Sequence, residues 1–454
     1  MPAPDVRGAG ETGADTDEKR AGKEPANLVG RIAWCSFDWA NSAFPTVIVT
    51  FVFAAYFAKV VAVDEITGTS QWSYAISLSM LACALLGPLL GSVADHIGRR
   101  KPWVLAFTML MVAATALLWF AMPKSPVVLH ILLCFALANF AFETSSIFYN
   151  AMLPAIAPPG MIGRLSGWGW GVGYLGGLAC LVTALLLLIQ PNPPLFGLDA
   201  ATSEPVRATA LLVAAWITLF SLPFWLLTPD APRSTISLTE ALRRGVVTVA
   251  GTLRLLKRHR GVTLFLIAHM IYTDGLNTLF AVGGIYAAVT FGMSFDELLI
   301  FGIALNITAG IGAFAFGWVD DWIGPKRTIL IALAGIGLLG TGILLVQSQT
   351  LFWAFALPIG TFLGPAQSAS RSLMARIAPP EVTTEMFGLY ALSGKATAFL
   401  GPAVFGWVTS LADSQRVGLS TILVFLAVGA ALLMPVRVVR VATRGVRAVQ
   451  LSGF

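Results

Sequence analysis

The sequence predicts an all-α integral membrane protein with 12 transmembrane helices in two pseudo-symmetric bundles of six. Composition, the placement of basic residues and an internal repeat lead to this prediction. Of the 454 residues, 57% are hydrophobic and only 11% are charged, whereas soluble globular chains carry about 25% charged residues. At roughly 20 apolar residues per crossing, the apolar runs supply about twelve crossings, and the gaps between them are too short for a soluble catalytic domain.

The elements follow from where the apolar runs begin and end. Residues 1–30 contain no apolar run and do not resemble a signal peptide, so we expect a disordered cytoplasmic tail there. We then expect an N-terminal six-helix bundle at 31–229, a cytoplasmic linker at 230–260, a C-terminal six-helix bundle at 261–436 and a basic cytoplasmic tail at 437–454. The helices are predicted at 32–59, 71–94, 102–122, 127–152, 163–189, 206–228, 262–289, 296–319, 328–347, 351–376, 386–411 and 417–436.

The basic residues orient these helices. If both termini face the cytoplasm, 24 of the 29 Lys and Arg residues lie in cytoplasmic segments, counting Arg371 and Arg376 near the end of the tenth helix. Lys395 then lies inside a helix. This distribution agrees with the positive-inside rule and predicts a multi-pass protein of a bacterial inner membrane with both termini cytoplasmic. The net charge of +6 therefore reflects topology, and we expect no nucleic-acid partner.

The linker is predicted to contain an amphipathic helix along the inner membrane surface. Ser237 and Glu240 have the spacing of a capping box. Apolar residues such as Leu242 and Val249 then recur at helical spacing among basic residues such as Arg243, a pattern typical of interfacial helices.

Three segments recur in the two halves in the same order, which indicates an internal repeat. The first is the turn after the second helix, with the pattern Gly-x-x-x-Asp-x-x-Gly followed by basic residues. The second is the sequence Ile-Ala-Pro-Pro, and the third is an Asp-x-x-Asn pattern in the first helix of each half. The matched segments are 91–100 with 317–327, 156–159 with 377–380, and 38–44 with 274–280.

Two six-helix halves joined by a basic loop, each with this Asp-containing turn, resemble the major facilitator superfamily. The runs at 37–44 and 274–280 resemble its vacuole-effluxer branch. The resemblance covers about 32–436 and implies a secondary transporter fold; fungal members of the branch are linked to amino-acid release from the vacuole. His96 and Trp322 stand where the superfamily usually has a basic residue, so the contacts of that residue are not expected here.

Ionisable side chains at membrane depth are functional candidates because they are costly there. Asp38 and Asn41 share one helix face, as do Asp274 and Asn277. The repeat predicts that the two pairs contribute to one site between the halves. They either bind protons or substrate, or they form a permanent hydrogen-bonded contact between helices.

A second group of candidates is asymmetric. Glu143 is a candidate for proton coupling or for an ion pair with Lys395 or Arg371, and its repeat-equivalent position lies near Gln367. Lys395 is a candidate for binding a substrate carboxylate or for that internal ion pair.

The repeated turns are predicted to act as conformational latches, because their aspartates can cap backbone N–H groups or meet a positive helix end. The alternative is ordinary solvated loop charges. The predicted latch residues are Gly91, Asp95, Gly98, Arg99, Arg100, Gly317, Asp321, Gly324, Lys326 and Arg327.

Other motifs do not support catalysis or a cofactor. The glycines from Gly171 to Gly176 follow no strand, so they favour helix packing over dinucleotide binding. The segment 393–397 lacks the first glycine of a phosphate-binding loop, and the four cysteines and His130 and His269 have no metal-site spacing. We therefore expect no metal, no cofactor and no enzymatic activity.

These features predict a secondary active transporter that works by alternating access. Its substrate is expected to be a small polar solute, with an amino-acid-like compound favoured and H+ as a candidate coupling ion. Its only other expected partner is the lipid bilayer, and we expect a monomer. Two alternatives stay open: efflux of amphipathic compounds or drugs, and a non-transporting receptor or scaffold. For transport, the first, fourth, fifth, seventh, eighth, tenth and eleventh helices should surround a central cavity, with the third, sixth, ninth and twelfth toward lipid.

Overall fold

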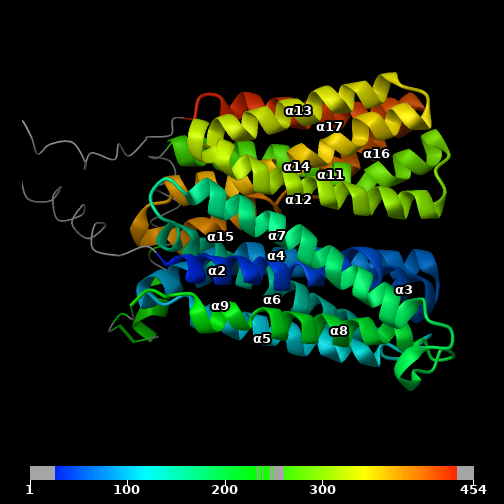
Figure 1. Ribbon diagram of the computed structural model, residues 1–454, viewed down its shortest axis with the longest axis horizontal. Helices are drawn as coiled ribbons and strands as arrows, with labels where there is room; N and C mark the ends of the chain where they lie inside the picture. Colours follow the sequence, from blue (N-terminus) through cyan, green and yellow to red (C-terminus); the bar gives the residue numbers. More distant parts are fainter. Residues whose placement is uncertain are drawn as a thin grey trace, which may run out of the picture.

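The computed structural model describes residues 26–232, 234, 236–237, 239–245, 248 and 260–436, and every regular element in these ranges is helical. Figure 1 shows the long helices lying roughly parallel in two groups, one from each half of the chain. The predicted tails at 1–30 and 437–454 lie almost entirely outside the described residues.

The N-terminal half supplies six crossings. Its first crossing turns into wider π-helical turns from Phe44, next to Pro45, which has no N–H to continue the α-helical pattern. Its elements are α2 (Leu28–Asn41), η1 (Phe44–Phe51), α3 (Phe53–Tyr56), η2 (Phe57–Val61), α4 (Glu65–Ile97), α5 (Lys101–Leu117), η3 (Leu118–Phe120), α6 (Val128–Ile156), α7 (Ile162–Ala184), η4 (Leu185–Ile189), η5 (Leu195–Gly197), α8 (Glu204–Phe220) and α9 (Leu222–Leu227).

The C-terminal half supplies the other six crossings, again with short local signals at the helix ends. Ser294 begins one helix with a complete capping box to Glu297, and Ser348 and Ser414 cap two others. The elements are α11 (Arg260–Phe291), α12 (Phe295–Ile323), α13 (Pro325–Leu345), α14 (Gln349–Ile377), η6 (Pro380–Val382), α15 (Thr383–Ser393), α16 (Leu400–Ala412) and α17 (Gln415–Leu433).

Within the described ranges, 10 helical segments are long and apolar enough to span a membrane. The two further crossings are α14, whose second half is polar from Gln367 to Arg376, and the eleventh helix, which is split into α15 and α16. The prediction of a continuous helix at 386–411 is therefore wrong. Pro402 lacks an N–H, and Gly394 and Gly401 weaken helix propensity on either side of the break.

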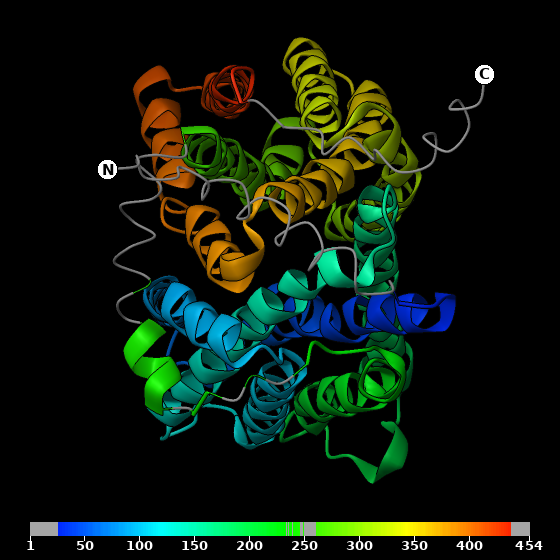
Figure 2. The same ribbon diagram turned by 90° about the vertical axis from the view of Figure 1, so that its left-hand side faces the viewer.

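The two halves meet through a small number of helices. α7 packs along α12 and also contacts α14, whereas α15 packs against α4 and α6. In Figure 2, α7 (teal) and α15 (orange) lie where the two groups face each other. The third, sixth, ninth and twelfth crossings (α5, α8, α13 and α17) make their extensive contacts within their own half, as a lipid-facing position requires. The second crossing, α4, joins the interface although it was not among the helices predicted to line the centre.

Glycines allow the close approach of α7 and α12. A Cβ at Gly167 would overlap the carbonyl of Ala313, and one at Gly171 would lie 2.9 Å from the carbonyl oxygen of Gly310. Gly173 and Gly176 instead lie against Ser42 and Trp39 of the first crossing, so the glycines from Gly171 to Gly176 allow close helix packing both between the halves and within one half.

The linker is helical at 239–245. The Glu240 N–H donates to Ser237 Oγ at 3.3 Å, as the capping prediction requires. Gly245 lies against Val93, because a Cβ there would be 2.9 Å from Cγ2 of that side chain. This helix therefore packs on the end of α4. The remainder of the predicted amphipathic helix, from Val249 onward, lies outside the described residues.

Candidate functional site between the two halves

Arg371 of α14 is the polar centre of the interface between the halves. Only 2% of the residue is exposed, and its guanidinium bonds to the N-terminal half throughout. Nη1 donates to Asp38 Oδ2 and to Asn150 Oδ1, each at 3.1 Å. Nε donates to Ser166 Oγ at 2.9 Å and Nη2 to the Ser166 carbonyl at 2.6 Å. Arg371 lies near the end of α14, as predicted, and it is buried between the halves.

Aromatic rings complete the surroundings of this guanidinium. Tyr149 stacks on Trp34 with ring centres 4.4 Å apart. The Tyr149 hydroxyl donates a hydrogen bond to Asp38 Oδ2 at 2.8 Å. The guanidinium carbon of Arg371 lies 5.2 Å from the Trp34 ring centre and 5.8 Å from that of Trp170, within cation–π range. Carboxylate and ring faces together offset the cost of burying the charge.

A second ion pair joins the halves. Lys395, in the break between α15 and α16, pairs with Glu143 of α6. The two side chains are 18% and 14% exposed. The structure therefore gives Glu143 the partner Lys395 rather than Arg371, and gives Lys395 an internal carboxylate.

Asp274 has a different role from Asp38. Both of its carboxylate oxygens accept from the Gly401 N–H at 3.2 Å, which caps the start of α16. Thr278 Oγ1 donates to the Asp274 carbonyl at 2.7 Å. These contacts stay within the C-terminal half, so the structure does not bring Asp274 and Asp38 into one contact network.

The amide candidates also lie in separate places. Asn41 is buried, and among the described residues its Oδ1 has no hydrogen-bond partner. Asn277 is half-buried on α11. Gln367 Oε1 accepts from the Tyr174 hydroxyl at 2.5 Å, which links α14 to α7.

His269, predicted as a packing residue, lies with its Nδ1 atom 2.8 Å from Ser393 Oγ.

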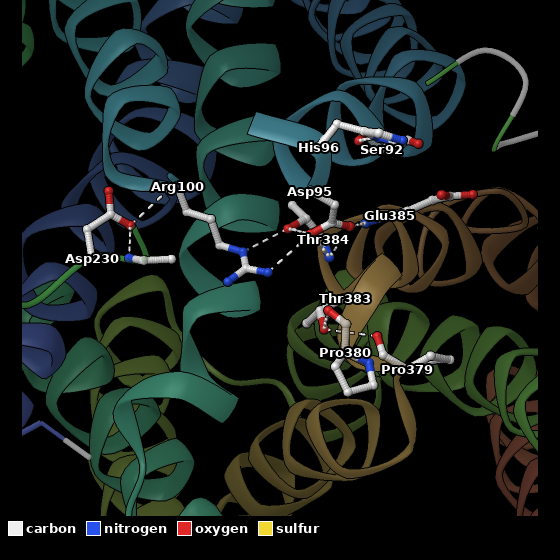
Figure 3. Close-up of polar contacts among 11 residues, drawn as sticks. Ser92, Asp95, His96, Arg100, Asp230, Pro379, Pro380, Thr383, Thr384 and Glu385 are labelled. Atoms are coloured by element: carbon white, nitrogen blue, oxygen red, sulfur yellow. Dashed lines mark hydrogen bonds and ion pairs between the residues drawn. The ribbon is translucent and has the colours of Figure 1, made fainter. Parts of the chain in front are cut away.

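Asp95, at the end of α4, caps the first turn of α15 in the opposite half (Figure 3). It accepts from the Thr384 N–H at 2.8 Å, from the Glu385 N–H at 3.0 Å and from Thr384 Oγ1 at 2.5 Å. Arg100 of its own half also pairs with it at 3.1 Å. Gly91 permits this approach, because a Cβ there would be 2.6 Å from the Thr384 carbonyl oxygen.

Asp321 makes the matching contact from the other half. At the end of α12, it accepts from the Gly163 N–H at 2.8 Å and the Arg164 N–H at 3.0 Å, in the first turn of α7. Arg164 Nε also pairs with it at 2.9 Å. Arg376 of its own half pairs with it at 2.9 Å. Both aspartates therefore cap a helix of the opposite half and keep one arginine of their own half.

The other predicted latch residues shape or surround these two turns. Gly98 and Gly324 adopt positive φ values of 86° and 94°, which favour glycine. Arg99 and Arg327 are exposed. A Cβ at Gly317 would be 2.9 Å from the Arg164 Cα, and Lys326 Nζ donates to the Met434 carbonyl at 2.5 Å.

Several residues of these clusters were missed in the sequence. Asn150 lies seven residues after Glu143 and so on the same helix face, a signal that was available. Asp320, which is 2% exposed and pairs with Arg376 at 3.1 Å, has no counterpart in the first repeat. Tyr149 and Ser166 carry no periodic signal, because their importance depends on a distant arginine.

Comparisons with known proteins agree with this architecture. A family described as vacuole effluxer Atg22 like matches residues 34–445. The chain is 26% identical over 414 residues to the uncharacterized MFS-type transporter YxiO of Bacillus subtilis (strain 168), covering 88% of this chain and 93% of that protein. It is 22% identical over 422 residues to autophagy-related protein 22 of Coccidioides immitis (strain RS). That match covers 76% of this chain and 68% of the fungal protein. These relatives are transporters, in agreement with the prediction that the chain is not an enzyme.

Solved structures show the same fold. FucP, a major facilitator superfamily transporter in its outward conformation, matches with a TM-score of 0.70 and 12% identity. The match covers 89% of this chain and 98% of FucP. This confirms the predicted major facilitator fold.

Proposed function

Since the chain belongs to the Atg22-like vacuole effluxer family of transporters, we propose that it moves a small polar solute by alternating access, with amino acids as the favoured class. The observation that carries this proposal is two of the three ion pairs that cross the interface among the described residues, Asp38 with Arg371 and Glu143 with Lys395; the third, Arg164 with Asp321, belongs to one of the predicted latch turns. In each of the first two, the carboxylate belongs to the N-terminal half and the cation to the C-terminal half.

Rocking of the halves separates such pairs, and a buried charge left unpaired costs about 3–5 kcal/mol. A zwitterion offers the missing charges: its carboxylate replaces Glu143 beside Lys395, and its ammonium replaces Lys395 beside Glu143. The substrate thereby lowers the cost of separating the halves, and binding becomes coupled to the conformational change.

The contacts of the two aspartates in the repeated turns support a proposal for the conformation. Asp95 and Asp321 both engage the opposite half at the end of the bundle that we place in the cytoplasm together with both termini. In contrast, α16 makes its extensive contacts only with α11 and α17 of its own half. We propose that this is a state closed toward the cytoplasm, in a chain that acts as a monomer.

Protons are the proposed coupling ion. Asp38 and Glu143 each lie in an ion pair that must open during transport, and a carboxylate separated from its cation in a low-dielectric site favours protonation. Asp274, which caps α16 within one half, keeps its contact when the halves separate and is the weaker candidate.

A thermal-shift screen of the purified full chain tests the substrate class, because a ligand that binds the native state raises its melting temperature. Amino acids should raise it, whereas analogues lacking either the carboxylate or the ammonium should not. Glu143→Gln and Lys395→Gln should each abolish the shift, and Lys59→Gln, at an exposed lysine elsewhere, should retain it. A shift produced by amphipathic drugs but not by amino acids would favour drug efflux. Absence of binding and transport for every class would favour a scaffold.

A further inference from the structure

A basic pocket lies outside the interface network, between the end of α4 and the linker helix at 239–245. It has a volume of about 320 Å³ and is lined by His96, Arg243, Arg244 and Thr248. We propose that this pocket binds a phosphate group, and specifically the headgroup phosphate of an anionic phospholipid. The proposal does not depend on the identity of the transported solute.

The charge of the pocket supports an anion. Glu240 pairs with both Arg243 and Arg244, at 3.0 and 2.6 Å, so one carboxylate faces two guanidinium groups. Hydrogen bonds from Arg243 and Arg244 lower the pKa of the Glu240 carboxyl to about 2. It therefore stays ionised at neutral pH, and the three side chains together retain one positive charge.

Donors remain for a phosphate oxygen. Among the described residues, Glu240 engages Nε and Nη2 of Arg243 but only Nε of Arg244. A guanidinium has five N–H donors, so the terminal nitrogens of Arg244 are left for the bidentate bonding that phosphate favours. His96 Nδ1 lies 2.8 Å from the Ser92 carbonyl, which can only accept. The Nδ1 atom therefore carries a proton, and Nε2 can donate to a phosphate oxygen only when the ring carries a second proton.

The segment that leads to the linker helix is held on the N-terminal half. The Ser234 N–H donates to the Ile97 carbonyl at 2.9 Å. Asp230 accepts from the Arg100 N–H at 3.0 Å and the Lys101 N–H at 3.3 Å, which caps α5 (Figure 3). Asp230 and Ser234 therefore fix the chain before the linker helix, and a phosphate bound by His96 and Arg244 would tie that helix to α4 next to Asp95.

The position of the pocket favours a lipid over a soluble anion. The linker helix lies at the end of the bundle predicted to face the cytoplasm, where the negative surface of anionic lipids attracts basic segments next to a membrane-spanning helix. Its exposed arginines, with side chains 78% and 52% accessible, can reach headgroups without burying charge.

The test measures the melting temperature of the full chain in micelles with added phosphatidylglycerol, phosphatidylcholine or inorganic phosphate. Phosphatidylglycerol should raise it more than phosphatidylcholine does. His96→Gln and Arg244→Gln should each remove at least half of that difference. Arg260→Gln is the matched control, because it removes one exposed positive charge near the same end without lining the pocket. Each variant is compared with its own lipid-free value, so a change in basal stability does not mimic lost binding.

An equal shift from inorganic phosphate, with the same dependence on His96 and Arg244, would support a phosphate site with a soluble source and overturn the lipid assignment. Equal losses in Arg260→Gln and Arg244→Gln would mean unspecific charge attraction and overturn the pocket. A shift unaffected by all three substitutions would overturn it as well.

Discussion

At the residue scale, Arg371 is a buried cation whose compensation comes from the opposite half. One carboxylate, one amide and the hydroxyl and carbonyl of Ser166 accept its hydrogen bonds, and Tyr149 orients the carboxylate of Asp38. Asp274 instead bonds to a backbone N–H. The two aspartates share a sequence motif, but one neutralises a charge and the other caps a helix.

This difference predicts unequal stability losses. Asp38→Asn removes the only carboxylate that contacts Arg371 among the described residues. Because Asp38 is 19% exposed, we expect a loss of about 2 kcal/mol, below the 3–5 kcal/mol of a fully buried pair. Asp274→Asn keeps an oxygen for the Gly401 N–H and should cost less than about 1 kcal/mol. Denaturant unfolding of the full chain in detergent measures both, and equal losses would contradict the assignment.

Proton coupling gives a second prediction for the same residues. If these carboxylates carry protons, at least one of Asp38→Asn and Asp274→Asn should lose pH-driven uphill transport while retaining downhill exchange, which needs no net proton movement. The contacts favour Asp38→Asn as that variant, since its ion pair crosses the interface. The measurement uses proteoliposomes with an imposed proton gradient. Wild-type pH profiles in both variants would end the proton hypothesis at these positions.

At the element scale, the eleventh helix has two parts with different partners. α15 packs on α4 and α6 across the interface, whereas α16 packs on α11 and α17. Lys395 lies in the turns between them, and Asp274 caps α16 from α11. The break therefore separates a part that contacts the opposite half from a part that belongs to its own half.

If the break is a hinge, restoring the helix should slow transport. Pro402→Ala returns the missing N–H and removes the ring that clashes with the preceding turn. We expect a several-fold lower transport rate with substrate binding retained, because only the movement of α16 relative to α15 is restricted. Pro358→Ala is the control, because Pro358 lies exposed inside the continuous helix α14. Equal transport by the two variants would show that the break does not limit the cycle.

The sequence predicts the membrane crossings, but it does not predict the break in the eleventh helix. Apolar runs and basic loops are local signals, so the crossings and the fold follow from them. An ion pair between Glu143 and Lys395 was one of the predicted alternatives, because both charged residues lie at membrane depth and need a partner there. The capping of α16 by Asp274, by contrast, requires a break in the eleventh helix. Its apolar pattern continues past Pro402, and only the packing of α11 against Gly401 reveals the cap.

At the scale of the whole molecule, two related turns join the two halves at the same end of the bundle. Asp95 caps α15 and Asp321 caps α7, so each half holds a helix of the other. When the halves separate at this end, the capping bonds break. The pairs with Arg100 and Arg376 persist because both partners belong to one half. Each aspartate therefore keeps a partner in both states, which limits the cost of opening.

The last prediction concerns this closure. Asp95→Asn and Asp321→Asn keep an acceptor oxygen but replace charge-assisted bonds, worth about 1.5–3 kcal/mol, by neutral bonds worth about 1 kcal/mol. A difference of about 1.4 kcal/mol shifts a two-state equilibrium roughly tenfold. Each variant should therefore favour opening at the predicted cytoplasmic end. The substrate affinity of either state should change little, because neither aspartate contacts the Asp38–Arg371 or the Glu143–Lys395 pair.

Cysteine-accessibility labelling at both ends of the bundle measures this shift, and equilibrium binding measures the affinity. Labelling should rise at the end where Asp95 and Asp321 lie and fall at the other. Asp321→Asn should have the larger effect, because it also loses the ion pair with Arg164 of the opposite half at 2.9 Å, whereas the ion pair of Asp95 is with Arg100 of its own half. Arg327→Gln, which alters an exposed charge next to the same turn, serves as the control and should leave both labelling patterns unchanged. If substrate binding disappeared while labelling at both ends stayed as in the wild type, the two aspartates would belong to the binding site and the closure mechanism would be wrong.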